Sequence, residues 1–417
     1  MNAANPIFGQ NKRIEIFMEA TVLIPCLLFA FAVWICILVI IVRASQPPFA
    51  ISPDGEPSTD LNDYSWSVTA HRLDGVCSII TGRVMGLLKK SLTIGAIPLL
   101  VMYLVLPVLF FLIPAVMQHV FFLNFDPFTT YSNLSVHGVR SIGRNFYLTF
   151  DEHSIGAWHV LPSELSANFD VQPNDSEIEQ LLATSGHPIV IYLHGNSFDR
   201  AGFHRCELYN VLADQQFHVI SIDYRGYGDS TGSPTEEGIV SDAHRVYKYA
   251  LQFSTQNNVP VYVWGHSMGT GVATRLVSEL SLSKNAPKGL ILESPFNNLK
   301  DVMLNHPFSG PYRWIPILDV LLVEPLRTAG LVMNTDERIT HISCPILLLH
   351  AEDDHVIPIK LARRLAESAK QAKRNVRLVE FDGERKFKHK YICRAEELPQ
   401  ILRTFISDCT KNDVQQA

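Results

Sequence analysis

The chain has 417 residues, 47% hydrophobic and 18% charged, enough for one large domain with additions or for two modest domains. Its formal net charge is −6 and it has no basic domain interleaved with aromatic residues, which argues against a nucleic-acid partner. Seven cysteines occur without a CxxC pair or a metal-like Cys/His spacing. We therefore expect neither a disulfide scaffold nor a metal site.

An uncharged apolar stretch occupies residues 20–42 of the leader, residues 1–43. At 1.5 Å per residue, a helix of this length matches a hydrocarbon core of about 30 Å. A cleaved signal peptide would have a shorter apolar region and a cleavage site, whereas here Arg43 follows directly. The stretch predicts an uncleaved membrane helix. A helix buried in a protein core is less favoured, because apolar residues cover every face.

A polar loop, residues 44–91, precedes a second apolar segment, residues 92–117. This segment is interrupted by three prolines, Pro98, Pro107 and Pro114. Prolines break soluble helices but are tolerated in membrane helices, where neighbouring groups satisfy the freed backbone. We predict a second membrane element within residues 92–124, either a kinked span or a re-entrant wedge.

Basic residues near the apolar segments predict the topology. Before the first apolar stretch lie Lys12 and Arg13, whereas more basic residues lie between the two apolar segments, among them Arg43, Arg83, Lys89 and Lys90. The more basic loop should be cytoplasmic, which places the chain beyond residue 124 on the lumenal or extracellular side. Two glycosylation sequons agree with this topology, one at Asn133 and one at Asn174.

From about residue 145 the chain alternates between short apolar runs and helical patterns. The expected strands are 145–150, 156–160, 188–193, 218–223, 261–265, 289–293, 345–350 and 376–381. The expected helices are 204–214, 236–252, 268–280, 361–372 and 396–408. Continuous apolar strands separated by helices predict a mostly parallel sheet covered on both faces. This eight-strand order is that of the α/β-hydrolase fold, which we assign to residues 125–417.

The sequence Gly265-His-Ser-Met-Gly269 follows the fifth expected strand and opens a helix. A Gly-x-Ser-x-Gly sequence in this context predicts a nucleophile elbow, whose sharp turn leaves no room for side chains two residues before and after the serine. The pattern alone is weak, because a solvated turn can contain it by chance. Its place between strand and helix makes Ser267 the predicted nucleophile.

A serine nucleophile needs a histidine base and a carboxylate that orients it. After the seventh strand, Asp353 and Asp354 compete for the acid, and we favour Asp354 because it lies two residues before the Ile357-Pro358 pair. Asp353 fits a turn or capping role. Only His389 follows the last strand, so it is the predicted base.

The reaction also needs donors for the oxyanion. We predict the backbone N–H groups of Asn196, in the loop after the third strand, and of Met268, directly after the serine. His194 is expected to orient this loop rather than to transfer protons.

Two further segments suggest substrate contacts. The turn that contains Arg225 fits a structural role, and the alternative is that Arg225 contacts an anionic head group. The insertion at residues 296–343 carries an apolar run and fits a helical lid over the active site, with a surface suited to an acyl chain.

Several segments together resemble the membrane-anchored α/β-hydrolase-domain serine lipases of the lysophosphatidylserine lipase and monoacylglycerol lipase type. They are Tyr192-Leu-His-Gly-Asn196, Asp223-Tyr-Arg-Gly-Tyr-Gly-Asp-Ser230, Trp264-Gly-His-Ser-Met-Gly-Thr-Gly-Val-Ala-Thr274, Leu292-Glu-Ser-Pro-Phe296, His341-Ile-Ser-Cys-Pro345, His350-Ala-Glu-Asp-Asp354 and His389-Lys-Tyr-Ile392. The resemblance carries the nucleophile, acid and base to Ser267, Asp354 and His389. That family has one span before the catalytic domain, so the stretch at 20–42 is additional.

The resemblance implies a lumen-facing enzyme of the endoplasmic reticulum membrane that hydrolyses lysophosphatidylserine and also monoacylglycerols, without a metal or organic cofactor. A protein acyl-thioesterase would use the same catalytic parts. A non-catalytic binding module on this fold is the alternative from another class, and the intact serine, acid and histidine argue against it.

Overall fold

The computed structural model describes residues 105–124, 130–306, 309–310 and 319–416, with isolated positions at 95, 97, 100 and 101. The chain divides into two compact units, residues 1–107 and 108–417, and all the strands described lie in the second. The expected membrane helix at 20–42, the polar loop at 44–91 and most of 92–104 lie outside the described residues. Among the described residues, no helix combines the length and apolarity needed to cross a membrane.

The end of the second apolar segment forms two short helices, α3 (Leu106–Leu112) and α4 (Pro114–Phe121). Ile113 separates them, and Pro114 opens α4, where its fixed φ suits the first turn and its missing N–H is not needed. Leu123 then pairs with Ser197 in a parallel bridge. Residues from 108 onward therefore belong to the same compact unit as the sheet.

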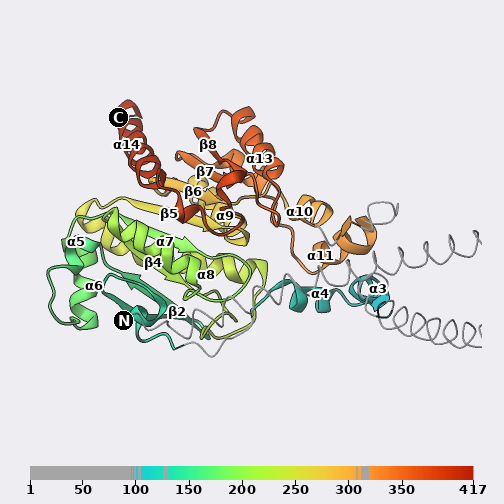
Figure 1. Cartoon of the computed structure of the whole chain (residues 1–417), viewed down its shortest axis with the longest axis horizontal. Helices are drawn as coiled ribbons and strands as arrows, with labels where there is room; N and C mark the ends of the chain where they lie inside the picture. The colour runs from blue at the N-terminus through green and yellow to red at the C-terminus, as the bar shows by residue number, and fades with distance from the viewer. Residues whose placement is uncertain are drawn as a thin grey trace, which may run out of the picture. The chain divides into compact units, whose positions relative to one another are not determined.

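The core element is a sheet of eight strands in the order β1-β2-β4-β3-β5-β6-β7-β8 (Figure 1). The strands are β1 (Gly143–Phe150), β2 (His153–Val160), β3 (Ile189–Leu193), β4 (His218–Ile222), β5 (Val261–His266), β6 (Gly289–Glu293), β7 (Ile346–Ala351) and β8 (Val376–Phe381). The pairs β1–β2 and β2–β4 are antiparallel, and all others are parallel. The predicted strands are confirmed.

The first hairpin is longer than predicted at both strands. Its turn contains only Asp151 and Glu152, and the pairing runs to Phe150 opposite His153. Asp151 adopts a positive φ of 51°, a conformation that Asp tolerates better than most residues and that tight hairpins require.

Helices cover the sheet in two layers. They are α5 (Ser163–Ser166), α6 (Asp175–Thr184), α7 (Phe203–Asp214), α8 (Glu236–Asn257), α9 (Met268–Leu282), α10 (Leu299–Asn305), α11 (Glu324–Thr328), α12 (Thr335–Arg338), α13 (Ile359–Gln371) and α14 (Leu398–Gln416), with short turns such as η2 (Leu134–His137), η6 (Gly383–Arg385) and η7 (Ile392–Arg394). Helix α8 contacts α6 and α9, and α12 contacts α9 and α13, whereas α7 and α14 each contact η7. Alternate strand residues such as Tyr192, Trp264 and Leu347 pack with α7 and α14 in one apolar core.

Helix α6 was not predicted. Its first turn is closed by a capping box, in which the Asn174 side chain accepts from the Glu177 N–H and the Glu177 carboxylate accepts from the Asn174 N–H. Only Ile178 and Leu182 are buried, so the helix has a weak apolar period. The same asparagine, Asn174, is both the cap of this helix and the acceptor of the predicted glycosylation sequon.

The insertion at 296–343 is helical in its described parts, as predicted, but it is built from short pieces. These are α10, the π-helical turn η4 (Asp319–Val323), α11, α12 and η5 (Ile339–His341). Leu322 and Leu326 are buried, and α11 packs against α4. That this insertion covers the active site stays a prediction.

A buried ion pair fixes the edge of the sheet where β3 and β4 end. Arg200 and Asp223 are both fully buried and pair through Nη1 and Oδ2, and the Arg200 backbone N–H donates to Asp223 Oδ1 at 2.5 Å. Arg200 also donates to Asp229 and Asn145, at 2.8 and 2.7 Å. Burial raises the pKa of Asp223 to about 7, although the guanidinium of Arg200 opposes this. The pair therefore ties the β3–α7 loop to the turn after β4.

We expect Arg200→Met to destabilise the protein by about 3–5 kcal/mol, because it leaves Asp223 buried without its cation. Thermal unfolding measures the loss. Arg363→Met is the matched control, because Arg363 pairs with Glu380 at the surface and is half exposed. Equal shifts in Tm for both variants would contradict the assigned role of the buried pair.

Candidate active site

Ser267 occupies a strained turn between β5 and α9. Its backbone has φ 53° and ψ −121°, outside the regions that residues with side chains prefer. A Cβ on Gly265 would lie 2.4 Å from the Gly269 carbonyl oxygen, and a Cβ on Gly269 would lie 2.0 Å from the Leu193 carbonyl oxygen. Both glycines are therefore required, as the elbow prediction states.

The structure brings Ser267, His389 and Asp354 into one hydrogen-bonded line. His389 Nε2 lies 2.8 Å from Ser267 Oγ, and His389 Nδ1 lies 2.7 Å from Asp354 Oδ2. His389 and Asp354 are buried, whereas Ser267 is partly exposed. Such an arrangement can take the proton of a serine hydroxyl while a carboxylate stabilises the resulting imidazolium.

Asp354 is held as a carboxylate. Its Oδ1 accepts from the backbone N–H groups of Val356 and Ile357, at 2.9 and 2.8 Å. Burial acts to raise the pKa of Asp354, but the adjoining rings of His389 and His350 outweigh it and hold the pKa well below its usual range. Asp354 therefore stays charged throughout the physiological range and can orient the histidine.

The competing carboxylate, Asp353, has a different partner. Its Oδ1 accepts from the backbone N–H of Lys388 at 2.9 Å, which holds the loop that carries His389. The favoured assignment of the acid to Asp354 therefore agrees with the geometry. Asp353 serves the loop, as expected of a turn residue.

His266 forms a hydrogen bond to the backbone of His389, a contact that the sequence did not predict. Its Nε2 lies 2.9 Å from the His389 carbonyl oxygen, and both its ring and that of His389 are buried. Burial lowers the pKa of His266 well below its usual value, and the nearby ring of His389 lowers it further. A neutral His266 therefore donates its Nε2 proton to the backbone of His389. In the sequence, only the position of His266 next to Ser267 indicated that it lies in the site.

The loop after β3 approaches the serine closely. A Cβ on Gly195 would lie 3.1 Å from the Ser267 Cβ, so the backbone that leads to Asn196 passes beside the nucleophile. Met268 begins α9, whose first backbone N–H groups have no partner within the helix. The predicted oxyanion donors thus come from two segments that meet at Ser267.

Buried polar groups shape this loop. His194 Nδ1 lies 2.7 Å from the Gly195 carbonyl oxygen, which matches the predicted orienting role. Burial lowers the pKa of His194, as does the nearby cation of Arg205. Arg205, from α7, donates to the Ser197 carbonyl at 2.5 Å and also binds the Asp199 carbonyl. The arginine was not predicted, because nothing in its helical context distinguishes it from a surface residue.

Arg225 is held by Asp242 of α8. Its Nη2 lies 2.7 Å from Asp242 Oδ1, its backbone N–H donates to Asp242 Oδ2 at 2.8 Å, and its side chain is 14% exposed. This pairing favours the structural interpretation of the turn. The head-group contact of Arg225 stays a prediction.

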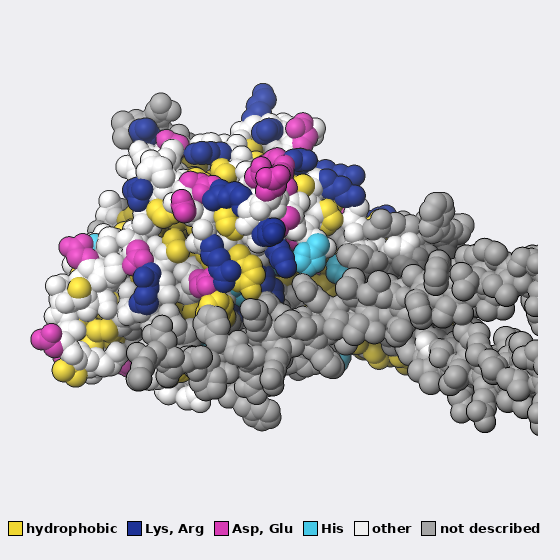
Figure 2. Space-filling model, in the orientation of Figure 1, with side chains coloured by type: hydrophobic (Ala, Val, Ile, Leu, Met, Phe, Trp, Pro, Cys, Tyr) yellow, Lys and Arg dark blue, Asp and Glu magenta, His cyan; other side chains and the backbone are white. Residues whose placement is uncertain are grey.

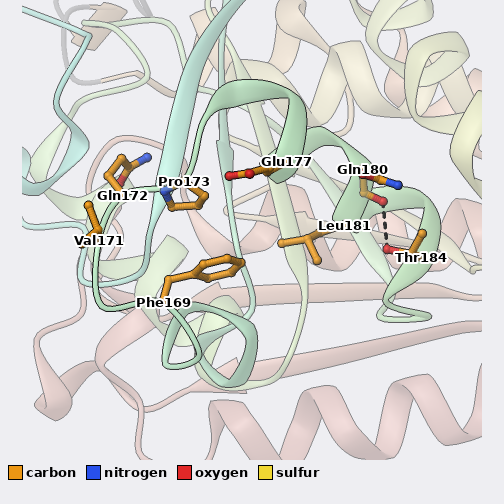
Figure 3. A pocket seen from close by; sticks show the side chains of 8 residues that line it. All are labelled: Phe169, Val171, Gln172, Pro173, Glu177, Gln180, Leu181 and Thr184. Atoms are coloured by element: carbon orange, nitrogen blue, oxygen red, sulfur yellow. Dashed lines mark hydrogen bonds between the residues drawn. The ribbon is translucent and has the colours of Figure 1, made fainter.

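On the face in Figure 2, basic and acidic side chains are interspersed. Figure 3 shows a pocket beside α6, lined by Phe169, Val171, Gln172, Pro173, Glu177, Gln180, Leu181 and Thr184. None of the predicted site residues lines it.

The fold and the site define a serine ester hydrolase of the α/β-hydrolase class. A family model described as "Serine aminopeptidase, S33" matches residues 185–324, which include the elbow. The "Lysophosphatidylserine lipase ABHD12" of Xenopus tropicalis is 42% identical over 335 residues, 78% of this chain and 85% of the relative. Its counterpart in Rattus norvegicus is 41% identical over 73% of this chain and 77% of the relative. The chain belongs to this ABHD12 lipase family.

Among solved structures, the esterase Pf2001 of Pyrococcus furiosus is similar to this chain. It shares 18% identity with a TM-score of 0.49, covering 68% of this chain and 97% of its own.

We expect Gly269→Ala to lower stability by about 1–3 kcal/mol, because its Cβ would overlap the Leu193 carbonyl and push α9 away from β3. The same displacement should slow labelling of Ser267 by a fluorophosphonate. Thermal unfolding and labelling rate measure the two effects. Gly310→Ala is the control, because a Cβ there meets no atom within 4 Å. An unchanged labelling rate in Gly269→Ala would refute the steric argument.

Proposed function

We propose that this enzyme removes the acyl chain from lysophosphatidylserine, with monoacylglycerols as further substrates, and that Ser267, His389 and Asp354 are its catalytic triad. The observation that carries the proposal is the hydrogen-bonded line from Ser267 Oγ through His389 to Asp354. It occurs in a chain 42% identical to a protein named for lysophosphatidylserine hydrolysis. The cleaved bond is the carboxylic ester of a single-chain lipid.

In the first step, Ser267 Oγ attacks the acyl carbonyl carbon and His389 Nε2 accepts its proton. The His389 Nδ1–H points to Asp354 Oδ2, which stabilises the charged ring. The protonated histidine then donates to the glycerol oxygen, which leaves, and an acyl-enzyme remains. Water, deprotonated by His389, releases the fatty acid and restores the serine.

The tetrahedral intermediate carries a negative oxygen. The backbone N–H groups of Asn196 and Met268 are the proposed donors, since their segments converge at Ser267. Donors fixed before the reaction need no reorganisation as the charge forms. That is why the stiffness of the β3–α7 loop matters to the rate.

The test is fatty-acid release from lysophosphatidylserine, a lysophosphatidylcholine, a monoacylglycerol and an acylated peptide. We expect Ser267→Ala to lose about 10⁴-fold or more of the activity, because it removes the nucleophile. Ser281→Ala is the control, since that serine lies in α9, the helix after Ser267, but donates to the Val277 carbonyl. Release led by lysophosphatidylserine supports the proposal. Serine-dependent release confined to the acylated peptide would instead assign a thioesterase.

We further propose that the enzyme is embedded in the endoplasmic reticulum membrane through its apolar segments, with the catalytic domain in the lumen. The support is the set of Lys and Arg residues in the polar loop at 44–91, together with two exposed sequons, at Asn133 and Asn174. Both asparagines use Oδ1 as a local acceptor, from Ser135 and Glu177 respectively. Their amide nitrogens are the atoms that would carry a glycan.

For a lumenal domain we expect both sequons to be glycosylated in a microsomal membrane. Asn133→Asp and Asn174→Asp keep the Oδ1 acceptor, and Asp is as good a helix N-cap as Asn. Each variant should therefore lose one glycan without losing stability, as seen by gel mobility before and after glycosidase treatment. A wild-type chain whose mobility does not change on treatment would count against the lumenal topology.

A further inference from the structure

The polypeptide that precedes the catalytic sheet is hydrogen-bonded to the loop that holds the proposed oxyanion donor. Both ends of the Asn196 side-chain amide bind residues 121–123. Nδ2 donates to the Phe121 carbonyl at 2.6 Å, and Oδ1 accepts from the Leu123 N–H at 3.3 Å. Leu123 and Ser197 also form a parallel bridge. This stretch therefore runs beside the loop at Asn196 and Ser197.

Tyr227 holds Asn196 from the turn after β4. Its hydroxyl lies 2.8 Å from Asn196 Oδ1 and 3.0 Å from the Asn196 carbonyl oxygen. Phe122 packs edge-on against the Tyr227 ring, with centroids 6.4 Å apart, and both side chains are buried. Asn196 is thus fixed through its side chain and through its own backbone carbonyl.

Two more hydrogen bonds fasten the same stretch to the turn after β4. Asn124 Nδ2 donates to the Gly226 carbonyl at 2.7 Å. Gln118 Nε2, from α4, donates to the Pro234 carbonyl at 2.9 Å. The stretch from α4 to Asn124 is therefore attached on two sides, and it cannot shift without moving the residues that hold Asn196.

We propose that residues 121–124 and Tyr227 position the oxyanion donor, the backbone N–H of Asn196. The segment that precedes the catalytic sheet then helps to set the geometry of the active site. The inference rests on the proposed function, because it concerns the donor of that reaction. The direction of the Asn196 N–H depends on the orientation of its peptide group, and the contacts on its carbonyl and side chain set that orientation. An error of about 1 Å in such a group lowers a rate by about 100-fold.

The experiment compares kcat and KM for lysophosphatidylserine in the full chain and two variants. Asn196→Ala keeps the backbone N–H but removes all three hydrogen bonds of the side-chain amide, and we expect kcat to fall about 100-fold. Tyr227→Phe removes only a hydroxyl and keeps the ring against Phe122, and we expect a fall of about tenfold. KM should change little in either, because the donor acts on the transition state.

The matched control is Tyr247→Phe. Its hydroxyl also donates to a backbone carbonyl, that of Asn285 at 2.9 Å, but from α8 to the loop after α9. For Tyr247→Phe we expect a wild-type kcat and a change in Tm similar to that of Tyr227→Phe. A fall in kcat in Tyr227→Phe alone then reports positioning and not general destabilisation.

The outcomes separate the inference from the proposed function. A fall in kcat alone supports the inference when the Asn196→Ala/Tyr227→Phe double variant loses less than the product of the two single losses, because both changes then act through one loop. Wild-type kcat in Tyr227→Phe, or a rise in KM at constant kcat, overturns it and leaves the proposed function standing. A wild-type chain without serine-dependent release defeats the proposed function and the inference with it. If Asn196→Ala does not fold, Tyr227→Phe decides alone.

Discussion

The approach of α9 to the carboxyl end of β3 is the constraint on which the site depends. The backbone of Gly269 lies so close to the Leu193 carbonyl that even a methyl group would not fit between them. The turn at Ser267 that leads into this contact has a positive φ, and the Ser267 hydroxyl lies 2.8 Å from His389 Nε2. Sheet packing and the position of the nucleophile therefore meet at this one turn.

The other parts of the site are brought to Ser267 by contacts between segments distant in sequence. Asp353 and His266 hold the loop of His389 by its backbone, at Lys388 and at His389 itself. Arg205 holds the β3–α7 loop in the same way, through carbonyl oxygens. Side chains that bind backbone fix loop geometry without adding reactive groups, so the site gains rigidity while its chemistry stays with three residues.

The strand order and the line through Ser267, Asp354 and His389 were open to prediction from sequence. Apolar runs identify buried strands, and in this fold each expected site residue follows a particular strand. The supporting contacts of His266, Arg205 and Tyr227 could not be predicted from sequence. A polar side chain in a strand, helix or turn gives no sign of its distant partner. Arg225 differs from them, since its turn already fitted a structural role with a head-group contact as the alternative, and the bond from its guanidinium to Asp242 favours the structural role.

The separation between Ser267 and His389 has a consequence for the protein while it is being made. The two residues are 122 positions apart, and among the described residues only η7 and α14 follow the histidine. At about 5–20 residues per second, a ribosome needs roughly 6–24 s to pass from the serine codon to the histidine codon. During that interval the nascent chain carries a serine hydroxyl with no base beside it. By the proposed mechanism, a nascent chain that ends before His389 cannot cleave lipids, and activity begins only after the histidine has been made.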